Sequence, residues 1–110
     1  MKITVTSRHF KAHQSLVEYA EAEIAKLNHF YDGIIKCDVI LNYEKPRNSR
    51  KIAEVKLSVY GTVLTAVGKS DDFQKSIGIA IEKVLTQLKK YKDRLHSKDR
   101  KLVRAVKAKV

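Results

Sequence analysis

The chain has 110 residues, 44% of them hydrophobic, and its 23 Lys and Arg exceed its 12 Asp and Glu to give a formal net charge of +11. This length suits one domain with a core of its own and leaves little room for a second. The single cysteine, Cys37, excludes an internal disulfide and a zinc cluster built on thiolates. The N-terminus has no apolar signal segment and no run reaches membrane-spanning length, which predicts a soluble, cytoplasmic protein without a membrane partner.

Most of the charge lies at the C-terminal end. From Lys89 to Val110 there are ten Lys or Arg and two Asp, a net +8 of the formal +11. Such a concentration is typical of proteins that bind phosphate groups, and it exceeds what solubility requires.

The first half of the chain predicts a strand, a helix and a second strand. Polar and apolar residues alternate over Lys2–Thr6, and apolar residues recur at helical spacing over about Gln14–Asn28. Gly33 follows this helix closely, as expected of a glycine that reverses the chain at a helix end. The second strand is expected over Ile35–Tyr43, with Cys37 on its apolar face as a small buried side chain.

The second half predicts two further strands. Residues Glu44–Arg50 are polar, contain the only proline and are expected to form a loop. Alternation resumes over Ala53–Val59, and a tight turn at Tyr60–Thr62 leads into a fourth strand over Val63–Val67.

The last helix is the clearest element. Ser70–Asp72 supplies a cap and first-turn acids, and an apolar stripe then runs from Phe73 to Leu95. Residues 97–110 are weakly amphipathic, and they either continue this helix or form an arm that orders on a partner. We therefore expect a domain over residues 1–96 and a basic tail over residues 97–110.

The order of elements indicates an α+β fold of the β-α-β-β-β-α type. Each helix has one apolar stripe, and the strands have one apolar face, so the expected architecture is a two-layer sandwich. Its four-stranded, mostly antiparallel sheet carries both helices on one face, and their outward sides flank a shared groove.

A row of basic side chains on the last helix is the strongest candidate site. Lys83, Lys90 and Arg94 are spaced by seven and four residues, so they project in nearly the same direction, and Lys89 and Lys92 broaden the row. Ammonium groups suit contacts with phosphate oxygens that do not depend on base sequence. The alternative is a solvated face, but the adjoining basic tail favours RNA or DNA binding. Reversing the charge of Lys83 and Lys90 is expected to abolish binding and leave folding intact.

The remaining polar residues predict no active site. His9 and His13 are four residues apart, but they straddle a strand-to-helix junction, where that spacing does not align metal ligands. Asp71 and Asp72 are interpreted as residues of a helix start, and no glycine-rich phosphate loop is present in the sequence. We expect no enzymatic activity, metal, cofactor or small-molecule substrate.

The tyrosines do not predict recognition by base stacking. Tyr91 lies on the apolar stripe of the last helix, and Tyr43 and Tyr60 close strands, so core and strand-end roles are favoured.

Three stretches resemble the family of ribosome hibernation promoting factors, also called ribosome-associated inhibitors or ribosomal subunit interface proteins. Residues 1–8 look like the opening strand of its short form, and Ile24-Ala25-Lys26-Leu27 with the following aromatic pair and Asp32 resembles the end of its first helix. The third stretch resembles the acid-aromatic start and basic ending of its second helix: Asp71-Asp72-Phe73, Ile81-Glu82-Lys83-Val84 and Gln87-Leu88-Lys89-Lys90-Tyr91-Lys92. The resemblance covers about residues 1–96.

The resemblance implies a fold like that of double-stranded-RNA-binding domains and binding to the small ribosomal subunit. The contacts would be made to ribosomal RNA in the channel for messenger and transfer RNA near the decoding site. The subunit interface of the whole ribosome would be a further partner. Occupying this channel would inhibit translation sterically and store inactive ribosomes. The basic contact positions of the family map onto Lys26, Lys83 and Lys90. With the helical row added, the predicted RNA-binding residues are Lys83, Lys90, Arg94, Lys89, Lys26, Lys75, Lys92 and Arg8.

The chain departs from the family pattern at several positions. Thr86 stands where a basic residue is usual, with Lys89 as a nearby compensating cation, and Asn28 stands where a glutamate is common. The loop at 46–50 is longer than in the shortest members, and the tail is basic where one short subtype is acidic. Promotion and prevention of ribosome pairing therefore both remain open.

Two alternative functions follow from the same residues. The first is a general binder of structured RNA without a fixed ribosomal site. The second is a small phosphate-handling enzyme that uses His9 or His13 as its acid-base group, although neither has a motif partner.

Overall fold

The computed structural model describes residues 1–44 and 50–109, with side chains described as far as residue 95. Its elements confirm the expected order: β1 (Lys2–Ser7), α1 (Gln14–Phe30), β2 (Lys36–Tyr43), β3 (Lys51–Val59), β4 (Thr62–Ser70) and α2 (Phe73–Lys109). Most of the predicted loop Glu44–Arg50 lies outside the described residues. Its two end residues are joined by a hydrogen bond of 2.9 Å from the Glu44 amide to the Arg50 carbonyl oxygen.

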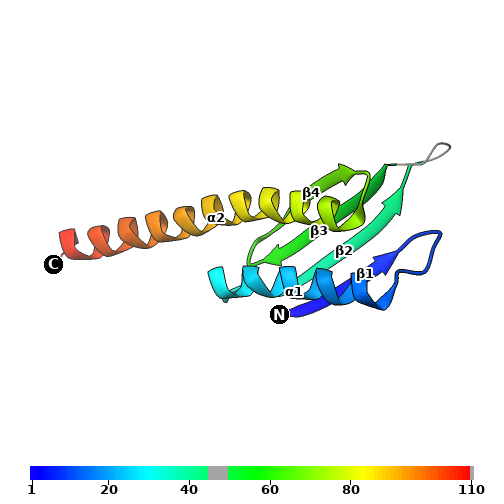
Figure 1. Cartoon of the computed structure of the whole chain (residues 1–110). Coiled ribbons are helices and arrows are strands. Elements are labelled where there is room, and N and C mark those ends of the chain that lie inside the picture. Colours follow the sequence, from blue (N-terminus) through cyan, green and yellow to red (C-terminus); the bar gives the residue numbers. More distant parts are fainter. Residues whose placement is uncertain (45–49, 110) are drawn as a thin grey trace.

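The four strands form one mixed sheet in the order β1-β2-β3-β4. β1 pairs with β2 in parallel, and the other two pairs are antiparallel. The register places Cys37 opposite Leu57 and Leu57 opposite Leu64, so the apolar residues of neighbouring strands share one face. Both helices cover this face and run in the same direction along it, which confirms the two-layer architecture (Figure 1).

The core fills the space between the sheet and the helices. Ile24 of α1, Leu57 of β3 and both Ile77 and Leu88 of α2 are fully buried there. Cys37 is also fully buried, and loss of hydration raises the pKa of its thiol to about 12, with the nearby Asp38 adding to the shift. The prediction that Cys37 is a small core residue is therefore confirmed.

Two small residues allow α2 to begin close against the sheet. A Cβ atom on Gly68 of β4 would meet the main-chain oxygen of Ser76 and lie 2.9 Å from the Ala80 nitrogen. Ser76 is fully buried, and its hydroxyl donates to the Lys51 carbonyl oxygen at 2.6 Å and lies 2.7 Å from the Ser70 hydroxyl. The first turn of α2 is thereby fixed to the ends of β3 and β4.

The helix ends differ in detail from those expected. α1 continues to Phe30, and Tyr31 caps it in an extended conformation, so Gly33 is not its left-handed chain-reversal residue. A Cβ atom at Gly33 would meet the end of the Tyr31 ring, so a larger residue there would displace that ring. α2 begins at Phe73, so the two aspartates precede the helix and do not lie in its first turn.

α2 is much longer than the sheet that it covers. It continues as a helix to Lys109, and at about 1.5 Å per residue its 37 residues span roughly 55 Å. Figure 1 shows its C-terminal half projecting beyond the sheet and beyond the end of α1. Within the described residues, neither helix holds an apolar segment able to span a membrane.

Candidate nucleic-acid interface

Side chains of α2 hold the helix against β4, which is an edge strand of the sheet. Three donors spaced four residues apart reach main-chain oxygens of the β3–β4 hairpin: Lys83 to Val67 at 2.9 Å, Gln87 to Thr65 at 2.7 Å and Tyr91 to Tyr60 at 2.8 Å. An edge strand has no neighbour for its outer carbonyl groups, so the bonds to Val67 and Thr65 satisfy acceptors of β4 that would otherwise depend on water, and the third bond reaches the hairpin turn. They fix the position of α2 and of every basic residue that it carries.

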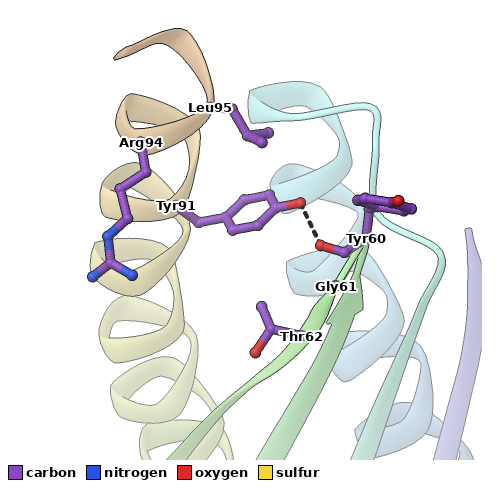
Figure 2. Close-up of a pocket in the computed structure, with 6 residues that line it drawn as sticks. All are labelled: Tyr60, Gly61, Thr62, Tyr91, Arg94 and Leu95. Atoms are coloured by element: carbon purple, nitrogen blue, oxygen red, sulfur yellow. Dashed lines mark hydrogen bonds between the residues drawn. The ribbon is translucent and has the colours of Figure 1, made fainter. Parts of the chain in front are cut away.

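Lys90 and Arg94 lie on this β4 flank of α2. They line a hollow of about 300 Å³ together with Thr62 and Leu64 of β4. Arg94 also borders an adjoining hollow of about 420 Å³ beside the turn of the hairpin, where Tyr91 crosses from α2 to the hairpin (Figure 2). Lys83, one helical turn before Gln87, continues the same flank, so the structure brings the three residues of the predicted row together.

Lys89 and Lys92 lie on the other flank of α2, beside α1. The Lys92 ammonium donates to the Phe30 carbonyl oxygen at 3.2 Å and lies 4.8 Å from the centre of the Phe30 ring. The Lys89 ammonium lies 5.9 Å from the same ring centre. The expectation that these two lysines broaden the row therefore needs correction. At 100° per residue they point away from it, and they form a second basic strip along the seam between the helices.

The other three predicted residues are separated from this row. Lys26 lies on α1 one turn before Phe30, at the same end of the molecule as Arg94, and pairs with Glu23 at 2.9 Å. Arg8 and Lys75 lie at the opposite end, where Phe10 stacks on Phe73 with ring centres 5.0 Å apart. Lys75 pairs there with Asp71 at 3.5 Å.

Six of the eight predicted cations have no carboxylate partner among the described side chains. Among the described side chains, the ion pairs involve Lys26, Lys36, Lys56, Lys69 and Lys75. The predicted residues without a carboxylate partner in that set are Arg8, Lys83, Lys89, Lys90, Lys92 and Arg94. Five of these six belong to α2, and four lie between residues 89 and 94, so the positive field is concentrated where α2 leaves the sheet.

Two residues of this region were missed by sequence reasoning. In the sequence, Gln87 stands out only as part of the stretch that resembles the family. Its hydrogen bond to Thr65 could not be predicted, because that bond depends on β4 being an edge strand. Tyr60 was placed correctly at the end of a strand, but its side chain is 82% exposed beside the hairpin turn. One feature of the sequence indicated such contacts. Tyr91 lies one helical turn after Gln87, and its hydroxyl gives the apolar stripe of α2 a polar edge.

The histidines that suggested an enzyme have structural roles. His9 adopts a left-handed conformation with φ of 67°, and its carbonyl oxygen accepts a hydrogen bond from the Tyr43 hydroxyl at 3.3 Å. His13 caps α1, and its Nδ1 accepts from the Ser15 amide at 3.3 Å. In residues 1–44 and 50–95, no three His, Cys, Asp or Glu side chains gather as a metal site would require.

Comparison with known sequences finds a matching family and relatives whose names refer to the ribosome. The family model described as Sigma 54 modulation protein / S30EA ribosomal protein matches residues 3–96. The ribosome hibernation promoting factor of Escherichia coli K12 is 30% identical over 95 residues, which cover 86% of this chain and 97% of that protein. The factor of the same name from Pseudomonas putida is 26% identical over 97 residues, covering 88% and 92% of the two chains.

Two solved structures share the fold. A ribosomal subunit interface protein from Coxiella burnetii superposes with a TM-score of 0.76 at 27% identity, over 84% of this chain and 99% of that one. The N-terminal domain of Thermus thermophilus Protein Y gives a TM-score of 0.73 over 83% and 99% of the two chains. Its identity of 22% supports a common fold alone.

Proposed function

Because this chain belongs to the Sigma 54 modulation protein / S30EA ribosomal protein family, we propose that it is a ribosome hibernation factor, which binds ribosomes and inhibits translation. It binds ribosomal RNA of the small subunit in the channel for messenger and transfer RNA, near the decoding site. It acts in the cytoplasm without catalysis, by excluding the ligands that normally occupy this channel.

The five cations of α2 without a carboxylate partner among the described side chains carry this proposal. Lys83, Lys90 and Arg94 face outward on one flank, and Lys89 and Lys92 on the other, so RNA strands can contact α2 from two sides. Lysine and arginine bound to phosphates release condensed counterions, which makes such binding strong at low salt and weak at high salt. Affinity then comes from the phosphate backbone, as expected for a protein that recognises a shaped RNA surface.

The shape of the molecule agrees with occupation of a channel. It measures 65 × 23 × 18 Å, and its basic α2 forms the long axis (Figure 1). A slender body of this kind can fill a passage built for strands of RNA, and it needs no reaction to keep them out.

Co-sedimentation with purified ribosomes and with separated subunits tests the proposal. The wild type is expected to sediment with small subunits and whole ribosomes and to inhibit cell-free translation. The double variant Lys90→Glu/Arg94→Glu should lose binding by on the order of tenfold or more at physiological salt. Lys2→Glu/Lys11→Glu is the matched control, because both residues are exposed, neither belongs to α2, and the change in net charge is the same.

Three results would contradict the proposal. They are equal loss in the two double variants, binding confined to the large subunit, and equal affinity for a long RNA duplex and for ribosomes. The last would identify the protein as a general binder of structured RNA.

A further inference from the structure

The hollow between the β3–β4 hairpin and α2 combines aromatic and cationic groups at one surface. Its volume is about 420 Å³, within the range of about 300–1,000 Å³ typical of pockets for small ligands. Figure 2 shows the Tyr91 ring spanning it, with Tyr60 on the hairpin side, Arg94 on the helix side and Leu95 above. The smaller hollow that holds Lys90 adjoins it through Thr62, Tyr91 and Arg94.

The hydrogen bond from Tyr91 to Tyr60 makes this hollow a formed feature of the fold. The Tyr91 hydroxyl donates to the main-chain oxygen of Tyr60 at 2.8 Å, and the Tyr91 ring meets Tyr31 edge-on with ring centres 5.9 Å apart. Tyr91 is therefore held in place from two sides. The side chain of Tyr60 takes no part in that bond and is 82% exposed, so its ring is available to a partner.

We propose that this hollow receives one unstacked base of an RNA strand, which stacks on Tyr60 while the phosphates beside it contact Arg94 and Lys90. The inference rests on the proposed function and deepens it, because it names the RNA feature that the hairpin side of α2 recognises. A base splayed out of a bulge or loop presents a flat apolar face together with flanking phosphates. The hollow offers the complementary set, with aromatic rings and Leu95 beside two cations.

The chemistry of the lining favours a nucleotide of RNA over other partners. Stacking on an aromatic ring accepts any base, because every base has a π-face. The planar guanidinium of Arg94 can bind a phosphate with two hydrogen bonds, and the compact ammonium of Lys90 acts as a point charge next to it. Among the described side chains, which end at Leu95, no carboxylate lines either hollow, so none of the described lining groups repels a polyanion.

Binding to three RNAs of nearly equal charge tests the inference: a perfect duplex, the same duplex with a one-nucleotide bulge, and that duplex with an abasic bulge. The two bulged RNAs have the same phosphates, so only the base differs between them. We expect the wild type to bind the bulged duplex about tenfold more tightly than its abasic counterpart. Equal affinities of the wild type for these two RNAs would overturn the inference.

Variants of Tyr60 assign the effect to this ring. Tyr60→Ala should remove the preference for the base, and Tyr60→Phe should keep it, because the hydrogen bond to Tyr91 uses the main chain of residue 60. Val63→Ala is the control, since Val63 is also exposed near the hairpin turn but lines neither hollow. A Tyr60→Ala protein that keeps the preference would also overturn the inference.

Ribosome binding separates this inference from the function on which it rests. If the wild type binds ribosomes and yet does not distinguish the two bulged RNAs, the inference fails and the proposed function stands. If the wild type prefers the bulged base but does not sediment with ribosomes, the proposed ribosome binding is wrong and the base-binding hollow stands.

Discussion

Lys83 and Val67 are joined across the edge of the sheet, with the lysine ammonium 2.9 Å from the main-chain oxygen of the valine. Lys83 was predicted from the sequence as a phosphate-binding residue with no part in folding. The structure gives it a contact that stabilises the packing of α2 on β4 as well. Its exposed ammonium has three donors, so one bond to Val67 leaves two for an RNA phosphate.

Lys83 and Lys90 should therefore respond differently to charge reversal. Lys83→Glu is expected to lower the free energy of unfolding by about 1 kcal/mol, because it removes the donor to Val67 and places a carboxylate near that oxygen. Lys90→Glu should leave stability within about 0.5 kcal/mol of the wild type, as for an exposed side chain without such a bond. Urea unfolding of the two variants measures the difference. Equal stabilities would show that the Lys83 bond contributes nothing.

Gly68 and Gly78 form a matched pair for the approach of α2 to the sheet. Gly68→Ala should destabilise the protein by about 1–3 kcal/mol, because its Cβ atom would meet the main chain of Ser76. Gly78→Ala should stabilise it by up to about 1 kcal/mol, since alanine favours the helix and nothing lies within 4 Å of the added atom. Thermal unfolding of both variants tests the pair, and a neutral Gly68→Ala would contradict the close packing described here.

Asp38 makes stability depend on pH in the acid range. A hydrogen bond from Thr4 lowers the pKa of this carboxyl below its ordinary value of 3.8, and Lys36 and Lys56 add to the effect while partial burial opposes it. A carboxyl whose pKa is lower in the folded state stabilises that state above the ordinary pKa. The contribution is then lost as the pH falls through the folded-state value.

Asp38→Asn should accordingly reduce the free energy of unfolding at pH 7 by about 1 kcal/mol. The stabilities of the wild type and the variant should converge as the pH falls below the folded-state pKa of Asp38, where the carboxyl is protonated in both states. Thr4→Val should give a similar loss at neutral pH, because it removes the hydrogen bond that contributes most to the shift. A difference between wild type and Asp38→Asn that stays constant from pH 7 to pH 2 would contradict this account.

The thiol of Cys37 should be inert in the folded protein. It is fully buried and its pKa is raised to about 12, so neither access nor ionisation favours reaction near neutral pH. An aromatic disulfide reagent at pH 8 should modify it only after denaturant unfolds the chain. Rapid modification of the native protein would show that the sheet opens locally at β2.

The elements and the buried face could be predicted from the sequence because they depend on local periodicity. Alternation in β2 and β3 and the stripe of α2 specify which side of each element faces the core, and Cys37 followed from its place in that pattern. The strand order did not follow in the same way. No local sequence pattern shows that β4 lies at an edge of the sheet. The bonds of Lys83 and Gln87 to its carbonyl groups therefore could not be predicted.

Only part of the candidate site could be predicted from the sequence, because the rest depends on tertiary packing. Helical spacing correctly grouped Lys83, Lys90 and Arg94, but it could not show that Lys89 and Lys92 lie against Phe30 of the other helix. That placement depends on how α1 and α2 pack together. The exposure of Tyr60 depends in turn on where the hairpin turn meets α2, which is also a tertiary relationship.

Competition on the ribosome tests the central claim most directly. Small subunits and whole ribosomes would be incubated with the protein and sedimented, either vacant or filled beforehand with messenger RNA and initiator transfer RNA. Occlusion of the channel predicts stoichiometric binding to vacant particles and displacement of the protein by the two ligands together. Binding that is unchanged on filled ribosomes would contradict the account, because the protein would then occupy a site that messenger and transfer RNA do not use.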